Sequence, residues 1–282
     1  MYTDDPKLAT REAPGLNVAI AKGWSVAIPN HLGPPRAYGA AKLGGQITLD
    51  GIRAAQRFDA LDLDASPVGM AGYSGGAMAT AIAAAIAPTY APELQLAGSA
   101  YGGAPMNIDK MAKALGQQKH PAFGLAMAAA LGLEREYPDR MPITSQLNSA
   151  GQQLRDQIAN TAANETMFLR RRPIPRRCRG PAMSAWRCST ARTLRPCSPT
   201  TASKTFLRCP MPLCTSGIRR IDVLIPVEAI DSTMARYCEA GVPVTSDVVS
   251  APDHLSAAGI GLPGALEFLD DRFAGIAPTT SC

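Results

Sequence analysis

The sequence predicts an α/β fold in which helices flank a mostly parallel sheet. A short apolar run at Val68–Ala71 leads through a Gly-rich turn into an Ala-rich segment, Ala77–Ala87, with high helix propensity. A second apolar stretch, Leu94–Ala100, follows and ends at another Gly-rich turn. Strand, helix and strand at this spacing are typical of parallel strands joined by crossover helices.

Length and composition fit one large domain over residues 1–282. Of these residues, 46% are hydrophobic and 18% charged, which is enough apolar content for a sizeable core. No uncharged apolar run reaches the length of a membrane span. Met1–Asp5 has neither the basic start nor the apolar stretch of a signal peptide. The chain is therefore expected to be cytoplasmic or to lack its natural beginning.

Two further elements are expected before the Gly-rich turn. Gly15–Ala21 has the pattern of a helix end, with Gly23 as its stop signal. Trp24–Pro29 has the composition of a buried strand, and Ala40–Phe58 has the apolar spacing of a helix. These elements continue the alternation of strands and helices.

Residues 105–168 are expected to form a helical cap inserted over the sheet, because no strand pattern interrupts them. Their Met- and Ala-rich faces could line an apolar substrate pocket or simply pack on the core. The helical segments are Met111–Leu115, Phe123–Leu133 and Leu147–Thr161.

The C-terminal part returns to alternating helices and strands. Val227–Glu239 is predicted to be a helix that ends at Gly241, and Val242–Val249 a strand. Asp253 and His254 are expected in a loop before a closing helix at Leu262–Phe273.

Residues 170–220 form an irregular Arg/Pro/Cys-rich segment. It holds twelve Arg, one Lys and five of the seven cysteines, and no Asp or Glu. Its cysteine spacings do not match a zinc site, and aromatic residues are too sparse for a typical nucleic-acid surface. The interpretation we favour is a shifted reading frame. A disordered natural insert and a nucleic-acid-binding patch are the alternatives.

The turn Gly72-Tyr73-Ser74-Gly75-Gly76 fits the G-x-S-x-G pattern of a nucleophile elbow. In an elbow, a serine adopts a strained backbone conformation between a strand and a helix, whose N-terminus directs backbone N–H groups toward the serine oxygen. Side chains at Gly72 and Gly76 are expected to collide with the adjacent strand and helix. The pattern predicts a catalytic serine; the alternative is a tight turn with a buried hydroxyl.

An activated serine needs a base, and the base needs an orienting carboxylate. Of the three histidines, only His254 follows a late strand, where an α/β-hydrolase holds its base. Asp222 is left as the acid, because Asp253 is too close to His254 in sequence to orient its ring. The alternative for His254 is an ordinary loop histidine. His31 is expected to be a polar loop residue rather than a second base, although it could border the site. The remaining carboxylates are expected in the cap (Asp109, Asp139, Asp156), in a helix (Asp231) and in a strand (Asp247).

Five pieces of the sequence together resemble the secretory lipase family of α/β-hydrolases. They are NHLG followed by LDGIRA, the elbow GYSGG, YAPEL with GGAPMN downstream, LNSAGQQL, and DVLIP with DHLSAAGIGLP. The resemblance covers roughly 10–168 and 221–275. It implies a helical cap over an acyl-binding tunnel and a triad in which Ser74 is the nucleophile, Asp222 the acid and His254 the base.

The resemblance also implies an activity, its requirements and a location. The expected reaction is hydrolysis of carboxylic esters in lipids such as triacylglycerols, with no metal or organic cofactor. The partners would be a lipid or ester substrate and a lipid–water interface, with no nucleic acid; the oligomeric state stays open. Relatives of this type are secreted or held in the cell envelope.

The sequence also departs from the family. The first strands of the sheet and the second oxyanion donor are expected to be missing, so that Gly75 supplies the one oxyanion N–H that can be assigned. An impaired or inactive lipase relative is therefore one alternative. An acyltransferase or peptidase that uses the same triad is another.

Overall fold

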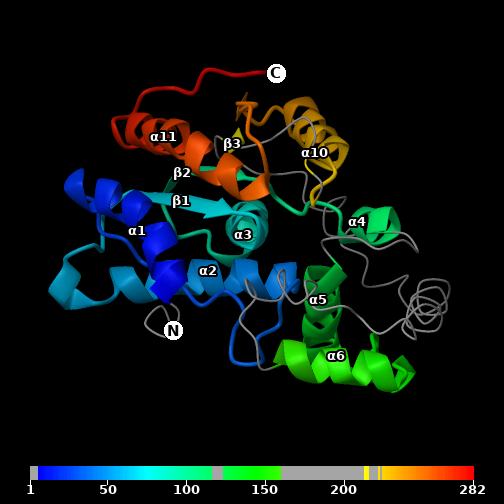
Figure 1. The fold of residues 1–282 in the computed structure, drawn as a ribbon. Helices are drawn as coiled ribbons and strands as arrows, with labels where there is room; N and C mark the ends of the chain where they lie inside the picture. The colour runs from blue at the N-terminus through cyan, green and yellow to red at the C-terminus, as the bar shows by residue number, and fades with distance from the viewer. Residues whose placement is uncertain (1–5, 116–122, 160–212, 216–221, 223) are drawn as a thin grey trace.

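The computed structural model describes residues 6–115, 123–159, 213–215, 222 and 224–282 of the chain (Figure 1). The described strands form one parallel sheet in the order β1-β2-β3-β4. Their bounds are β1 Val68–Tyr73, β2 Leu96–Gly102, β3 Leu213–Thr215 and β4 Val244–Ser246. The described α-helices are α1 Pro6–Ala21, α2 Ala41–Gln56, α3 Gly75–Tyr90, α4 Ile108–Leu115, α5 Phe123–Glu136, α6 Ser149–Ala159, α10 Val227–Glu239 and α11 His254–Phe273. Two short 3-10 helices lie at Asp59–Leu61 and Thr144–Gln146.

Helices cover both faces of the sheet (Figure 1). On one face, Met70 of β1 and Tyr101 of β2 share a core with the alanines of α3 and with Ile230 and Met234 of α10. On the other face, Ala100 of β2 packs against Phe268 and Leu269 of α11. This arrangement is that of an α/β-hydrolase, as the sequence predicts.

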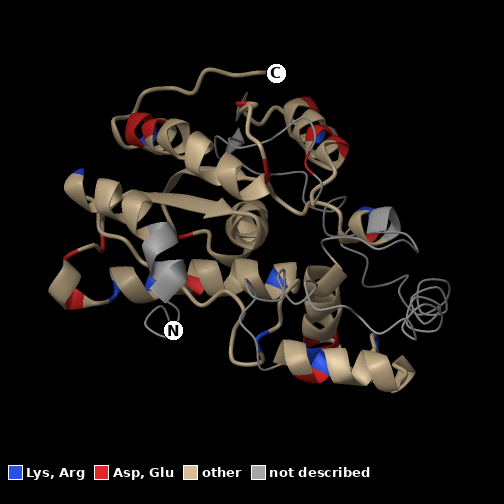
Figure 2. Ribbon diagram, viewed as in Figure 1, with Lys and Arg blue, Asp and Glu red and all other residues tan. Residues whose placement is uncertain are grey.

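The helix α3 is buried along most of its length and contains no charged residue (Figure 2). Small side chains let α2 approach it closely. A Cβ at Gly45 of α2 would lie 2.9 Å from the backbone nitrogen of Ala83 in α3. Because that atom cannot move aside, the contact requires glycine. The helix α3, which begins at the Gly-rich turn, is therefore packed closely against α2.

Most of the expected helices are confirmed, with small changes at their ends. The predicted helix Ala40–Phe58 corresponds to α2, and Val227–Glu239 is α10 residue for residue. Gly23 follows α1 with a φ of 82°, the left-handed conformation of a helix stop. The predicted strand Leu94–Ala100 is β2, shifted by two residues.

The prediction of a buried strand at Trp24–Pro29 is wrong. This segment pairs with no described strand, and Val26 and Ile28 are 42% and 49% exposed. Trp24 instead packs its ring against Phe273 of α11, with the ring centroids 5.0 Å apart. An apolar run becomes a strand only where it exchanges hydrogen bonds with a neighbouring strand, and this segment exchanges none with the described sheet.

The segment expected to be irregular, residues 170–220, contains one described strand, β3. The strand β3 pairs in parallel with β2 on one side and β4 on the other. It therefore fills the position from which the chain proceeds to Asp222. The rest of the segment lies outside the described residues.

The helices α5 and α6, which lie in the predicted cap at 105–168, share an apolar core of their own. Met127 and Leu131 of α5 pack with Leu154 and Ile158 of α6. Tyr38, from the loop before α2, joins this cluster. The apolar faces are therefore largely used in packing. Within the described residues, no helix has the length and apolar character needed to cross a membrane.

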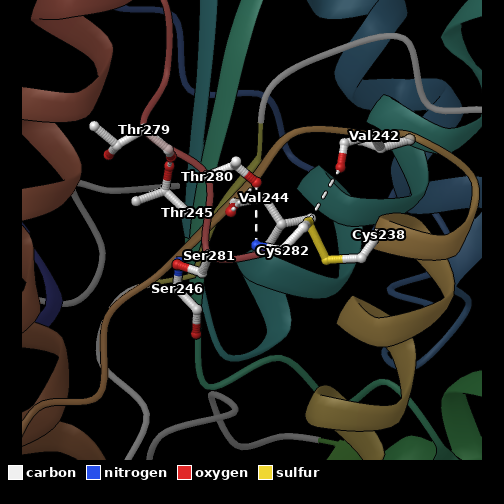
Figure 3. The surroundings of a disulfide bond; sticks show 9 residues. All are labelled: Cys238, Val242, Val244, Thr245, Ser246, Thr279, Thr280, Ser281 and Cys282. Carbon is white, nitrogen blue, oxygen red and sulfur yellow. Dashed lines mark hydrogen bonds between the residues drawn. A yellow bond between two sulfur atoms is a disulfide. The ribbon is translucent and has the colours of Figure 1, made fainter.

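The C-terminal tail is tied to α10 by a disulfide between Cys238 and Cys282 (Figure 3). The Ser281 backbone N–H donates to the Val244 carbonyl of β4 at 2.6 Å, and the Ser281 hydroxyl accepts from the Ser246 N–H at 2.9 Å. The tail thus lies along β4. We refer to residues 279–282 as the C-terminal strap.

Candidate active site

Ser74 lies between β1 and α3 in a strained backbone conformation, with φ 54° and ψ −114°. Residues other than glycine rarely adopt such angles, and they persist only where the surroundings hold them. The Ser74 N–H donates to the Gly102 carbonyl of β2 at 3.0 Å, and its own carbonyl accepts from Met78 of α3 at 3.1 Å. Ser74 is half-buried. Its hydroxyl does not make the N-cap hydrogen bond that a serine at this position often makes.

The two glycines expected to have steric roles behave differently. A Cβ at Gly72 would lie 2.5 Å from both the carbonyl carbon and the oxygen of Gly76, so the elbow closes only with glycine at Gly72. The same expectation for Gly76 is wrong, because a Cβ there would meet no heavy atom within 4 Å. The Gly76 backbone therefore excludes a side chain at position 72, whereas position 76 itself has room for one.

Gly75 is the first residue of α3, so its N–H has no acceptor within the helix. It can therefore donate to an oxygen bound beside Ser74. Tyr38 lies next to it, with its Cε2 atom 3.2 Å from the position of a Cβ at Gly75. Burial raises the pKa of Tyr38 to about 12. Sequence reasoning could not find this contact, because Tyr38 belongs to a turn-rich loop more than thirty residues upstream.

The structure brings Asp222 and His254 together. The Oδ2 atom of Asp222 lies 2.6 Å from Nδ1 of His254, and the two side chains are only 3% and 4% exposed. The other carboxylate oxygen, Oδ1, accepts the N–H groups of Leu224 and Ile225 at 2.8 and 3.1 Å. Burial raises the pKa of Asp222, but the hydrogen bond and charge of His254 and these two backbone donors outweigh it, so the pKa is lowered overall.

His254 does not lie in a loop, as the sequence suggested, but is the first residue of α11. Asp253 is the N-cap of this helix: its carboxylate accepts the N–H groups of Leu255 and Ser256 at 2.9 and 3.0 Å and the Ser256 hydroxyl at 2.6 Å. Asp253 is therefore occupied with the helix, in agreement with its exclusion as the acid. The cap fixes the point from which the imidazole projects.

Ser74 and His254 both lie at the carboxyl end of β2. Ser74 is bonded to Gly102, and the Cε1 atom of His254 would be 2.7 Å from a Cβ at Gly103. The Nε2 atom of His254 is buried and has no hydrogen-bond partner among the described residues, so no bond yet joins it to the Ser74 hydroxyl. Catalytic hydrogen bonds are often long before substrate binds. Tyr73, the elbow residue directly before Ser74, lies with its ring against that of His254, with the ring centroids 5.0 Å apart.

The other residues singled out from the sequence lie on other elements. His31 belongs to the turn-rich loop before α2, and burial lowers its pKa. Asp231 lies in α10, and Asp247 follows β4. Among the described residues, no three His, Cys, Asp or Glu side chains gather as a metal site would require.

Comparison with known proteins agrees with the sequence resemblance. The family model for secretory lipases matches residues 11–281. A probable inactive lipase of Mycobacterium tuberculosis is 29% identical over 263 residues, which cover 92% of this chain and 57% of that protein. A secreted triacylglycerol lipase of Malassezia furfur is 40% identical over 119 residues, which cover 42% of this chain and 31% of that protein.

The fold is also that of a solved lipase. The crystal structure of Candida antarctica lipase A aligns with a TM-score of 0.76 and 24% identity, covering 95% of this chain and 62% of that one. The chain spans less than three fifths of the length of the two relatives above. Because the family model extends over nearly the whole sequence, the chain belongs to the secretory lipase family.

Proposed function

We propose that the chain is a serine ester hydrolase of lipase type, in which Ser74, His254 and Asp222 form the catalytic triad. The observation that carries the proposal is the buried Asp222–His254 pair, 2.6 Å apart, beside a serine held at φ 54°. A buried carboxylate bonded to a histidine, next to a strained serine at a helix N-terminus, is the arrangement that activates a hydroxyl nucleophile.

The reaction proceeds through an acyl-enzyme. His254 Nε2 takes the proton of the Ser74 hydroxyl as Oγ attacks the ester carbonyl carbon, and Asp222 stabilises the imidazolium that forms. The Gly75 N–H donates to the oxyanion of the tetrahedral intermediate. His254 then gives its proton to the leaving alkoxide. A water molecule, deprotonated by His254, attacks the acyl-Ser74 ester and releases the acid.

Lipid esters such as triacylglycerols are the proposed substrates, met at a lipid–water interface. The names of the relatives support this, since the Malassezia furfur protein is a triacylglycerol lipase. The described part of residues 105–168, with α5 and α6 on their own core, is proposed to be the cap over the acyl site. The Cys238–Cys282 disulfide supports secretion or a place in the cell envelope, because disulfides persist in oxidising compartments.

A catalytically impaired relative is the second candidate. Among the described residues, His254 Nε2 has no hydrogen bond to Ser74, and one relative of the chain is itself described as a probable inactive lipase. Weakening of a single stabilising contact, such as one oxyanion donor, typically lowers a rate by about 10²–10³-fold without abolishing it. An impaired enzyme would thus retain a serine-dependent activity at a low rate.

Hydrolysis of p-nitrophenyl esters with short and long acyl chains tests the proposal, with Ser74→Ala as the control. We expect hydrolysis that falls at least ~10³-fold in the variant, because the nucleophile is lost. Labelling of Ser74 by a fluorophosphonate would separate an impaired enzyme from an inert protein. Equal hydrolysis by the variant would refute the role of Ser74, and cleavage of peptides in preference to esters would favour a peptidase.

A further inference from the structure

We infer that Tyr73 is a positioning residue for the catalytic base: its phenol holds the backbone of His254 and its ring supports the imidazole. The inference rests on the proposed function, in which His254 is the base. Tyr73 occupies the variable position directly before the serine in the G-x-S-x-G pattern, which by itself requires no particular side chain.

The contact is a short hydrogen bond between distant parts of the chain. The Tyr73 hydroxyl donates to the backbone carbonyl of His254 at 2.6 Å, across a sequence separation of 181 residues. The two rings are also in contact, with centroids 5.0 Å apart and planes inclined at 46°. Tyr73 therefore touches both the backbone and the ring of the proposed base.

The absence of a side chain at Gly103 leaves room for both rings. Gly103 follows β2 with a φ of 56°, a conformation that favours glycine. A Cβ at Gly103 would lie 2.7 Å from Cε1 of His254 and 2.8 and 2.9 Å from Cζ and Oη of Tyr73. A side chain at position 103 would therefore displace both rings, and only glycine leaves room for them side by side.

These contacts hold His254 at two points, its backbone and its ring. Asp222 holds Nδ1 at 2.6 Å, while Tyr73 holds the carbonyl of the same residue. With backbone and Nδ1 both fixed, the direction in which Nε2 points is set. Burial, and then the charges of Asp222 and Asp253, raise the pKa of Tyr73, so its hydroxyl stays a donor while the base works.

The connection also joins the two halves of the site. Tyr73 is the residue before Ser74, and its side chain ends on the first residue of α11. A shift of His254 relative to Ser74 would have to break this hydrogen bond. Misplacement of a catalytic group by about 1 Å can lower a rate by about 10²-fold.

The test compares Tyr73→Phe with Tyr90→Phe. Tyr90, at the far end of α3, donates to Asp50 at 2.9 Å in an exposed pair, so its variant also loses one tyrosine hydrogen bond. We expect Tyr73→Phe to lower kcat for an activated ester about 10–100-fold, with KM within about twofold. Tyr90→Phe should leave both constants near those of the parent. Replacement of Tyr73 by 4-aminophenylalanine, which keeps ring and donor, should restore kcat.

A measurement without substrate separates this inference from the proposed function. The proton on Nδ1 of His254, bonded to Asp222, should give a downfield NMR resonance in the parent and in Tyr90→Phe. In Tyr73→Phe we expect that resonance to broaden or shift, even if the chain proves inactive as an esterase. An unchanged resonance together with unchanged kcat would overturn the inference. So would unfolding of Tyr73→Phe where the 4-aminophenylalanine protein is folded, since the hydroxyl would then serve stability alone.

Discussion

The serine side of the site and its acid–base side are built in different ways. The backbone that holds Ser74 is shaped by Gly72, Gly76 and the start of α3, all within a few residues of it. Asp222 and His254 lie 32 residues apart. Asp222 follows β3, His254 follows the N-cap of α11, and the His254 carbonyl accepts the hydroxyl of Tyr73, 181 residues upstream. The first side is encoded locally, whereas the second is assembled by tertiary packing.

The largest effect is expected on the assembled side, from Asp222→Asn. The amide can no longer stabilise an imidazolium or hold the required tautomer, so kcat should fall by about 10⁴-fold. Asp253→Asn is the matched control, because asparagine also caps helices well and the residue does not face Nδ1 of His254. Ester hydrolysis under saturating substrate measures both variants. Equal activities in the two would mean that Asp222 is not the acid.

The same variant reports how far the pair stabilises the fold. Because the folded-state pKa of Asp222 is lowered, its ionised form stabilises the protein above the usual carboxylate pKa of about 4. This contribution is lost as the pH falls through the lowered folded-state pKa. The difference in unfolding free energy between the parent and Asp222→Asn should therefore shrink on acidification. A difference that is the same at neutral and acid pH would argue against the lowered pKa.

On the local side, Gly72→Ala should destabilise the fold by more than ~3 kcal/mol. Its Cβ would lie 2.5 Å from backbone atoms of Gly76 that cannot move without opening the elbow. Gly76→Ala is the matched control. Its Cβ meets open space in a helix, so alanine should be neutral or stabilising by up to ~1 kcal/mol. Urea unfolding followed by circular dichroism measures both, and similar midpoints would contradict the geometry of the elbow.

A smaller effect is expected from Cys282→Ser, which tests whether tertiary anchoring far from Ser74 matters to the site. The disulfide closes a loop of 44 residues that contains His254, and its loss should reduce stability by roughly 2–4 kcal/mol. The rate constant kcat at low temperature should change little, because the C-terminal strap bonds to β4 and α10 rather than to Asp222 or His254. Calorimetry and ester hydrolysis check the two parts. A large loss of kcat in folded protein would link the strap to the base.

The same division explains what could be predicted from the sequence. The elbow was readable because Gly72 and Ser74 act through neighbours in the chain. The strand β3 was not, because Leu213–Thr215 become a strand by pairing with Ser99–Tyr101 and Val244–Ser246. The strand prediction for Trp24–Pro29 is wrong for the opposite reason: the segment has a strand-like composition but pairs with no described strand.

At the start of α11 the sequence contains a helix N-cap signal, but residues downstream of it argue against a helix. Asp253 is a favoured N-cap residue, yet Gly259, Gly261 and Pro263 downstream argue against a helix. Burial of Ala257, Phe268 and Leu269 overrides that local preference. Elimination could propose Asp222 and His254 as acid and base, but it could not predict their 2.6 Å contact.

The C-terminal strap has a consequence for the solubility of the protein. An outer strand such as β4 presents unpaired backbone groups, and these can recruit a strand from another molecule. In this structure the Val244 carbonyl already accepts the Ser281 N–H, and the Cys238–Cys282 disulfide links the tail to α10. The end of the chain thus occupies the edge where a neighbouring copy could begin an aggregate.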